Sequence, residues 1–272
     1  MPTVVPGRGF VAGQFSVVSP GTERRHLAGP DREAGYMTLG RTDETAGWVL
    51  APVPHGAAFT PDCPGAVTAP PGAAPRLVAL ARFQQMASLG LDRAPTADLD
   101  DAVIVGSGPV ALGCALELRR RGVTRITVVT ARRHAPIGRA PGVHCVAPSG
   151  AGRGQLVIDA AGTPAYAAGL TQDGGVLGLL GTPDPGDVIP ALELHRGGRT
   201  VVGMHELAPA TDGAYQAAFT AVALWLAGHL DPALVDGWCR TVPGPRAPEL
   251  FALLDAPGRP AEPVLLLDWR TS

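Results

Sequence analysis

The feature that most constrains the fold is a glycine-containing turn within the segment VIVGSGPVALG. Residues 102–105 (AVIV) form an apolar run typical of a buried parallel strand, and residues 110–121 have the character of a helix. Between them, Gly106, Gly108 and Ala111 follow the G-x-G-x-x-G/A spacing, which permits a tight turn, a close approach of a pyrophosphate and close helix packing. The alternative is an ordinary glycine-rich turn, but the strand–turn–helix context favours a dinucleotide site.

Further apolar runs follow this unit at regular intervals. They are predicted strands at residues 126–129, 156–159, 176–181 and 200–203. Because helical or loop segments separate them, the pattern predicts an α/β domain with a doubly wound parallel sheet over residues 98–206.

The residues after the second predicted strand indicate which dinucleotide is bound. An NAD enzyme usually has an acidic residue there for the ribose 2′-hydroxyl, whereas this chain has Thr130, Ala131, Arg132 and Arg133. Guanidinium groups offer charge and forked donors to a 2′-phosphate, so we expect NADP(H). The missing acid also counts against an S-adenosylmethionine methyltransferase. The alternative is that both arginines are solvated and the adenosine end is loosely held.

The flanking regions have a different character. Residues 1–97 are rich in Pro and Gly, with short predicted strands and one predicted helix at 74–90. Residues 207–272 contain two predicted helices and two predicted strands, and we expect them to fold back on the N-terminal region. The predicted elements are strands at 9–18, 47–53, 57–60, 235–241 and 263–268, and helices at 215–230 and 248–254.

Composition narrows the chemistry. All 22 basic residues are Arg, which excludes a catalytic lysine, a P-loop lysine and a Tyr/Lys reductase pair. The four cysteines are widely spaced, which argues against a structural zinc site and a disulfide framework. A net charge of −2 gives no support for binding nucleic acid or an anionic membrane. With no apolar run of membrane-spanning length and no signal-peptide pattern, we expect a cytoplasmic protein.

Several segments together resemble the medium-chain dehydrogenase/reductase superfamily. These are DAVIVGSGPVALGCALELRRRG, VIDAAGTPAYAAGLTQDGGVLGLLGTP and, near the C-terminus, ALWLAGHLDPALV with ELFALLD and PVLLLDW. Upstream, SVVSPGTERRHLAG, GYMTLG and GWVLAPVPHGAAFT resemble the N-terminal part of that family, with bacteriochlorophyllide alcohol dehydrogenase-like members the nearest in pattern. The resemblance implies a split, abbreviated GroES-like catalytic domain, residues 1–97 and 207–272, around the Rossmann domain. It also implies a homodimer.

The resemblance further implies which positions face the coenzyme. Gly106 and Gly108 open the pyrophosphate loop, and Thr130, Arg132 and Arg133 would lie at the adenosine ribose. The other positions that the resemblance implies are Pro109, Val110, Ala161, Gly162, Gly181, Thr182, Gly203 and Met204, of which the last four would lie near the nicotinamide.

The chain departs from the family where zinc-dependent members hold their metal. Pro20 stands at the position of their first Cys ligand, and Gly35-Tyr36 replaces their His-Glu pair. The four-cysteine structural lobe is absent, and the N-terminal domain is shorter than usual. Catalytic zinc needs three protein ligands from Cys, His or carboxylate side chains, and no such trio aligns with the family's ligand positions. We therefore expect no metal.

Without zinc, a reductase must polarise its substrate with hydrogen-bond donors. Tyr36 is a candidate donor, with a Tyr packed between strands as the alternative. His55 is a second candidate, or else a surface-loop histidine, and Glu23 is a third, or else part of a solvated helix start. His205-Glu206 could reach the nicotinamide end, whereas Asp159 at the end of a buried strand is expected to cap the next turn.

Two functional hypotheses follow. The first is an NADPH-dependent, zinc-independent oxidoreductase that acts on a small organic carbonyl, alkene or imine, in specialised biosynthesis. The second is a dinucleotide-binding protein with a non-redox role, such as a regulatory or scaffold subunit, or a cyclase that reuses the reductase fold. The missing zinc ligands and the short N-terminal domain motivate the second.

Overall fold

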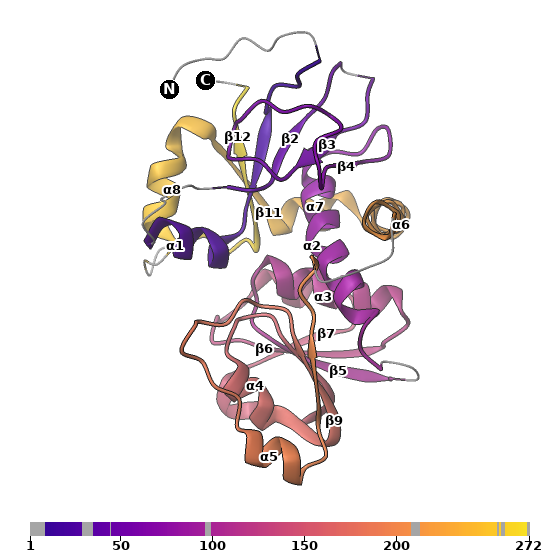
Figure 1. Ribbon diagram of the computed structural model, residues 1–272, viewed down its shortest axis with the longest axis vertical. Helices are drawn as coiled ribbons and strands as arrows, with labels where there is room; N and C mark the ends of the chain where they lie inside the picture. The colour runs from indigo at the N-terminus through magenta and orange to yellow at the C-terminus, as the bar shows by residue number, and fades with distance from the viewer. Residues whose placement is uncertain are drawn as a thin grey trace. The chain divides into compact units, whose positions relative to one another are not determined.

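The structure is a computed structural model that describes residues 9–28, 35–43, 45–95, 99–207, 213–254, 256 and 259–270. The chain divides into two compact units. Unit 1 comprises Met1–Ala81 and Gly213–Ser272, and unit 2 comprises Arg82–Asp212. Figure 1 shows the elements of each unit.

Unit 2 alternates strands with helices or short connections, as the sequence predicts. Its elements are β5 (Asp101–Val105), α3 (Pro109–Arg120), β6 (Arg125–Val129), η1 (Pro136–Arg139), β7 (Val143–Val146), η2 (Pro148–Gly150), β8 (Gly154–Asp159), α4 (Pro164–Leu170), β9 (Thr171–Leu179), α5 (Ala191–Arg196) and β10 (Thr200–Gly203).

The six strands of unit 2 form an all-parallel sheet in the order β10-β9-β8-β5-β6-β7. This is the strand order of a Rossmann fold, 3-2-1-4-5-6. The chain leaves β5 toward β6 but leaves β8 toward β9, in the opposite direction. Right-handed crossovers therefore place α3 and α4 on opposite faces, with a switch point between β5 and β8. The predicted doubly wound sheet is confirmed.

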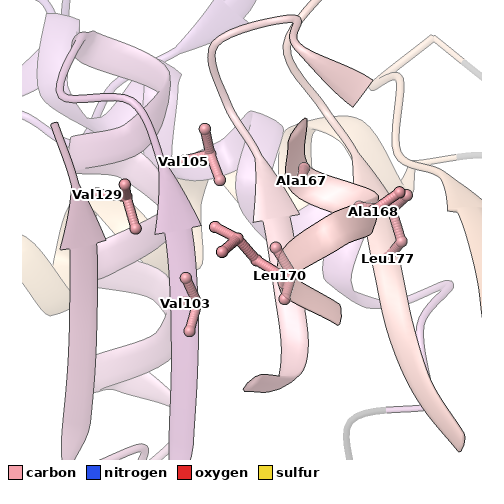
Figure 2. Packing of buried hydrophobic residues seen from close by; sticks show 8 residues of the cluster. Val103, Val105, Val129, Ala167, Ala168, Leu170 and Leu177 are labelled. Atoms are coloured by element: carbon pink, nitrogen blue, oxygen red, sulfur yellow. The ribbon is translucent and has the colours of Figure 1, made fainter. Parts of the chain in front are cut away.

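Both faces of this sheet are buried at its central strands, such as β5 and β8, which explains why those strands are largely apolar. On one face, α4 packs against alternate valines of neighbouring strands, as Figure 2 shows. On the other face lie the intervening residues, such as Ile104 and Val128, which are also fully buried. The buried cluster beneath α4 comprises Val103, Val105, Val129, Val157, Ala167, Ala168, Leu170 and Leu177.

Helix α2 (Pro75–Leu91) crosses the boundary between the two units, which falls after Ala81 rather than at the predicted residue 97. From Val78 to Leu91 every residue is buried, so no polar stripe marks a solvent face. In unit 2, a Cβ on Gly113 of α3 would lie 2.3 Å from the Phe83 carbonyl oxygen of α2. The two helices can approach this closely because position 113 has no side chain.

Unit 1 contains a mixed sheet in the order β11-β12-β1-β2-β3-β4. The C-terminal strand pairs antiparallel with β1, so the C-terminal segment returns to the N-terminal region as expected. The elements of unit 1 other than α2 are β1 (Phe15–Val18), α1 (Pro20–Ala28), β2 (Thr38–Gly40), β3 (Val49–Ala51), β4 (Val67–Thr68), α6 (Ala214–His229), α7 (Pro232–Trp238), β11 (Cys239–Pro243), η3 (Gly244–Arg246), α8 (Ala247–Leu253) and β12 (Val264–Asp268).

Helix α6 is long and largely apolar, with Phe219, Val222 and Leu226 buried and Leu224 exposed. No single helix among the described residues has the length and hydropathy of a membrane span. Helices α6 and α7 meet both criteria only as a pair, and the pair is bent by 115°.

Two sequence-based predictions of secondary structure are wrong, and one strand was not predicted. The predicted strand at 235–241 begins as α7, because the Asp231 carboxylate caps that helix by accepting from the Ala233 amide at 2.8 Å and Pro232 opens it. The predicted strand at 57–60 is a single bridge between Phe59 and Val11. Strand β7 was not predicted, because VHCV is short and lies half exposed at the sheet edge.

Candidate functional site

The carboxyl ends of β5 and β8 meet at the switch point of the unit 2 sheet, where ligands of such sheets bind. Gly106 follows β5 with a φ of +110°, a conformation that favours glycine. A Cβ at Gly106 would lie 3.2 Å from the Cβ of Ala161, which follows β8. The two loops therefore touch, and the first glycine of the motif is required by both backbone shape and space.

Gly108 is the N-cap of α3, with an extended backbone and no side-chain cap. A Cβ added there would meet no protein atom within 4 Å. The space in front of the helix is thus open, whereas the first amides of α3 have no acceptors within the helix. Pro109 and Val110 are the first residues of a twelve-residue helix, whose N-terminal amides and dipole suit a pyrophosphate.

Asp159 fixes the loop that follows β8. Its Oδ1 accepts from the amides of Ala161 at 3.1 Å and Gly162 at 2.9 Å, which confirms the predicted cap. Burial raises the pKa of this carboxyl above its ordinary value, although the amide hydrogen bonds oppose the shift. Its backbone oxygen accepts from the Gly181 amide at 2.7 Å, and this links the loop after β9 to the same edge.

Gly162 and Gly181 are glycines because these loops are crowded. A Cβ on Gly162 would lie 2.2 Å from the Thr182 carbonyl oxygen, and one on Gly181 would lie 2.6 Å from the Gly162 nitrogen. The predicted coenzyme-facing positions Ala161, Gly181 and Thr182 therefore lie together at the carboxyl edge. Thr182 is exposed there.

The turn after β6 is tied to the glycine loop by hydroxyl groups. The Ser107 and Thr130 side-chain oxygens lie 2.8 Å apart, and Thr130 Oγ1 also accepts from the Arg132 amide at 3.1 Å. The Thr130 side chain thereby holds the start of the arginine turn beside the switch point. Arg132 is half-buried and Arg133 is exposed, and His134 has a positive φ of 55°, which turns the chain toward η1.

Gly203 ends β10 and Met204 follows it, but the Met204 side chain does not face solvent. It is fully buried, where a Cβ on Gly90 would lie 2.8 Å from its Cβ and one on Gly178 would lie 2.3 Å from its Cε. Its amide donates to the Leu179 oxygen at 2.8 Å. Met204 therefore anchors the loop after β10, and only its backbone could face a ligand.

Unit 1 brings two of the predicted catalytic residues together. Glu23 Oε1 of α1 lies 3.1 Å from His55 Nε2, and their side chains are 0% and 5% exposed. The surface-loop alternative for His55 and the solvated alternative for Glu23 are therefore wrong. The His55 ring also stacks on Phe251 of α8, with centroids 5.8 Å apart.

The same carboxylate reaches the segment that carries Tyr36. Glu23 Oε2 accepts from the Gly35 amide at 2.9 Å, and Gly35, with a φ of +94°, lies against the His55 ring. Tyr36 is the next residue and is half-buried. The buried Glu23 carboxylate thus contacts His55 and also holds Gly35, the residue before Tyr36.

A hydroxyl network secures the other side of His55. Ser16 Oγ accepts from the Gly56 amide at 3.0 Å and from Trp269 Nε1 at 2.9 Å, and lies 3.2 Å from Thr38 Oγ1. The loop that carries His55 is therefore held on strands β1, β2 and the end of β12. No group of three or more His, Cys, Asp or Glu side chains within the described part of the chain could hold a metal ion.

Sequence reasoning missed several side chains of these sites, among them Ser107, Phe251 and Arg82. Ser107 sits between the two glycines of the motif, and its hydroxyl in that position was a usable signal. Phe251 stacks on His55, and Arg82 pairs with Glu206, but no local pattern links those residues.

Comparisons with known proteins support the same architecture. No protein-family model and no curated protein sequence matches the chain. Among solved structures, 2R,3R-butanediol dehydrogenase from Bacillus subtilis matches with a TM-score of 0.73 and 15% identity, over 99% of this chain and 94% of that chain. An alcohol dehydrogenase from Thermus sp. ATN1 has the same TM-score at 14% identity, over 99% of this chain and 97% of that chain.

A third solved structure is that of an enzyme studied with its coenzyme. The quinone oxidoreductase from Thermus thermophilus, also solved in complex with NADPH, has a TM-score of 0.68 and 20% identity, over 99% and 94% of the two chains. Identities this low establish the architecture and not the reaction. The chain therefore has the fold of the medium-chain dehydrogenases and reductases.

Proposed function

We propose that this chain is an NADPH-dependent, zinc-independent oxidoreductase that acts on a small organic carbonyl, activated alkene or imine. The observation that carries the proposal is the hydroxyl-tied arginine turn beside an open, glycine-lined helix N-terminus at the switch point. This arrangement offers amides to a pyrophosphate and guanidinium groups to a ribose phosphate.

In this proposal, different residues of unit 2 bind different parts of the coenzyme. Gly106, Gly108, Pro109 and Val110 would hold the pyrophosphate, and Thr130, Arg132 and Arg133 would hold the adenosine ribose and its phosphate. The positions that would line the nicotinamide half are Ala161, Gly162, Gly181, Thr182, Gly203 and Met204. When bound, the coenzyme supplies the hydride from its nicotinamide C4.

Unit 1 supplies the polar groups for the substrate in this proposal. The Tyr36 hydroxyl would donate a hydrogen bond or a proton to the substrate oxygen or nitrogen. Glu23 would hold the His55 imidazole in one orientation, since a buried ring paired with a carboxylate cannot rotate freely. Glu23 is then a positioning residue, and His55 is the second candidate proton donor.

Coenzyme binding is the first test. We expect NADPH, at micromolar concentrations, to bind more tightly than NADH in calorimetric titrations. Replacing both Arg132 and Arg133 with Ala should abolish that preference, whereas Arg139→Ala, a change of an exposed arginine in the same connection, should leave it intact. If well-folded protein takes up neither coenzyme, the proposal is wrong.

Turnover is the second test, and it separates the two functional hypotheses. We expect NADPH oxidation at 340 nm with at least one member of a panel of ketones, enones and cyclic imines. Tyr36→Phe should lower the rate by about 100-fold if the phenol acts as the acid, while the NADPH affinity stays unchanged. Binding without turnover across the panel would instead favour the non-redox role.

A further inference from the structure

The direction in which a dinucleotide would lie follows from the sheet order, given the coenzyme site proposed above. The pyrophosphate sits at α3, and the adenosine half extends toward β6, where the arginine turn lies. The nicotinamide half must then extend the other way, over the carboxyl ends of β8, β9 and β10. Residues 160–163, 180–183 and 204–207 follow these strands, and His205 is the only imidazole among them.

Residues 204–206 are braced on both sides of this histidine. Met204 is buried against the positions of Gly90 and Gly178, as described above. The His205 carbonyl oxygen accepts from Arg93 Nη1 at 2.8 Å. Glu206 forms an ion pair with Arg82, and these two side chains are 11% and 4% exposed.

The ion pair that holds these residues costs free energy to bury. Burying the Arg82–Glu206 ion pair has a desolvation penalty, so we take the pair as a device that defines the conformation of residues 204–206 rather than as a large contribution to stability. The backbone on both sides of His205 is fixed, yet its side chain is exposed. The loop therefore presents an imidazole in a defined place at the nicotinamide end of the sheet.

The hydrogen bonding of His205 also fixes its tautomer. The Leu207 amide donates to His205 Nδ1 at 3.2 Å, so Nδ1 acts as an acceptor and carries no proton. The proton of the neutral ring is then on Nε2, the nitrogen farther from the backbone. With its proton on Nε2, the ring offers a hydrogen-bond donor on the side away from the backbone.

We propose that the Nε2–H of His205 donates a hydrogen bond to the nicotinamide half of the coenzyme. This proposal rests on the proposed coenzyme site, and it assigns His205 a positioning role that is separate from Tyr36 and His55. The carboxamide oxygen is the acceptor in that half whose orientation such a donor would set.

The test compares NADP⁺ with adenosine 2′,5′-bisphosphate, which lacks the nicotinamide half. By calorimetry, we expect His205→Ala to raise the Kd for NADP⁺ about five- to tenfold, as for loss of one hydrogen bond, and to leave the Kd for the bisphosphate unchanged. His205→Phe, a ring without a donor, should behave like His205→Ala. His205→Gln keeps a side-chain N–H and should retain most of the affinity.

The matched control is His195→Ala, which removes an exposed histidine from α5, ahead of the amino end of β10. It should change neither Kd, and all variants should keep the wild-type melting temperature. Equal weakening of both ligands by His205→Ala, or of neither, would overturn the proposal. Failure of the wild-type protein to bind either ligand would instead overturn the coenzyme site on which it rests.

A second measurement starts from the free protein. Two-bond ¹H–¹⁵N spectra of the imidazoles should show His205 as the Nε2–H tautomer, with its signals assigned from His205→Gln. We expect NADP⁺ to shift these signals and the bisphosphate to leave them in place. A predominant Nδ1–H tautomer in the free protein would contradict the proposed donor.

Discussion

Glu117 of α3 is a fully buried carboxylate whose partners all lie in unit 2. It accepts from Arg120, Arg121 and Gln84 at distances between 2.7 and 3.1 Å. Burial by itself raises the pKa of Glu117, but the arginine hydrogen bonds and charges outweigh it and the pKa is lowered. The ionised side chain therefore stabilises the fold at neutral pH.

Replacing this carboxylate tests its contribution to stability. We expect Glu117→Ala to lower the free energy of unfolding by about 2–3 kcal/mol, because three donors lose a charged acceptor. Denaturant titration by circular dichroism measures it. Glu249→Ala, which removes an exposed partner of Arg246 at the same i,i+3 spacing as Arg120 and Glu117, is the control and should have no measurable effect. Equal effects of the two changes would contradict this interpretation.

Asp159 gives a pH dependence of the opposite sign. Because burial raises its pKa in the folded state, ionisation of Asp159 costs stability at pH 7. That cost disappears as the pH falls through the raised value toward the ordinary 3.8, where the unfolded chain also becomes protonated. Asp159→Asn keeps an oxygen for the two amides and has no charge. We therefore expect a higher melting temperature than wild type at pH 7 and a difference that shrinks toward pH 4. A difference independent of pH would contradict this assignment.

Gly106 and Gly108 make separable predictions about fold and binding. Gly106→Ala forces a side chain into a positive-φ position against Ala161, so it should lower stability by about 1–2 kcal/mol. Gly108→Ala meets open space and should leave the melting temperature unchanged. It should nevertheless weaken NADPH binding at least tenfold, since the methyl group would occupy the approach of the pyrophosphate. Unchanged NADPH affinity in Gly108→Ala would count against the coenzyme site.

At the scale of elements, the contact between α2 and α3 depends on one missing side chain. A Cβ on Gly113 would overlap the backbone of α2 at Phe83, so Gly113→Ala must push two buried helices apart. We expect a loss of about 1–3 kcal/mol in the free energy of unfolding. Gly169→Ala in α4 meets no atom within 4 Å and should instead stabilise by about 0.5–1 kcal/mol through helix propensity. Chemical denaturation of both variants checks the opposite signs.

At the scale of the whole molecule, all four tryptophans lie in unit 1, whereas the proposed coenzyme site lies in unit 2. Helix α2 is continuous across the boundary and buried from Val78 onward, so we expect the units to unfold together. NADPH at 100 times its Kd should stabilise the protein by about 2.7 kcal/mol. The tryptophan-detected melting midpoint should therefore rise with the midpoint detected by circular dichroism. A rise in the second alone would show that the units unfold independently.

Local patterns were enough to predict most elements, but they failed where tertiary context decides. The strand and glycine signals of β5, the arginine turn and helices α2, α3 and α6 were all identifiable in short windows. The segment at 235–241 misled because its apolar residues suit both periods, and the capping pair Asp231-Pro232 decided for a helix. Strand β7 was not predicted because a strand at the edge of a sheet is partly exposed and therefore needs few apolar residues.

The sequence by itself determined the parallel sheet, the glycine loop and the arginines beside it, because each depends on residues close together along the chain. Only the tertiary structure decided that Glu23 pairs with His55 and that the His55 ring stacks on Phe251. The same holds for Arg82 and Arg93, which contact the residues around His205. Those contacts join residues distant in sequence. The spacing of polar residues along the sequence does not indicate which of them contact one another. Only the folded structure therefore shows which charged groups are buried together.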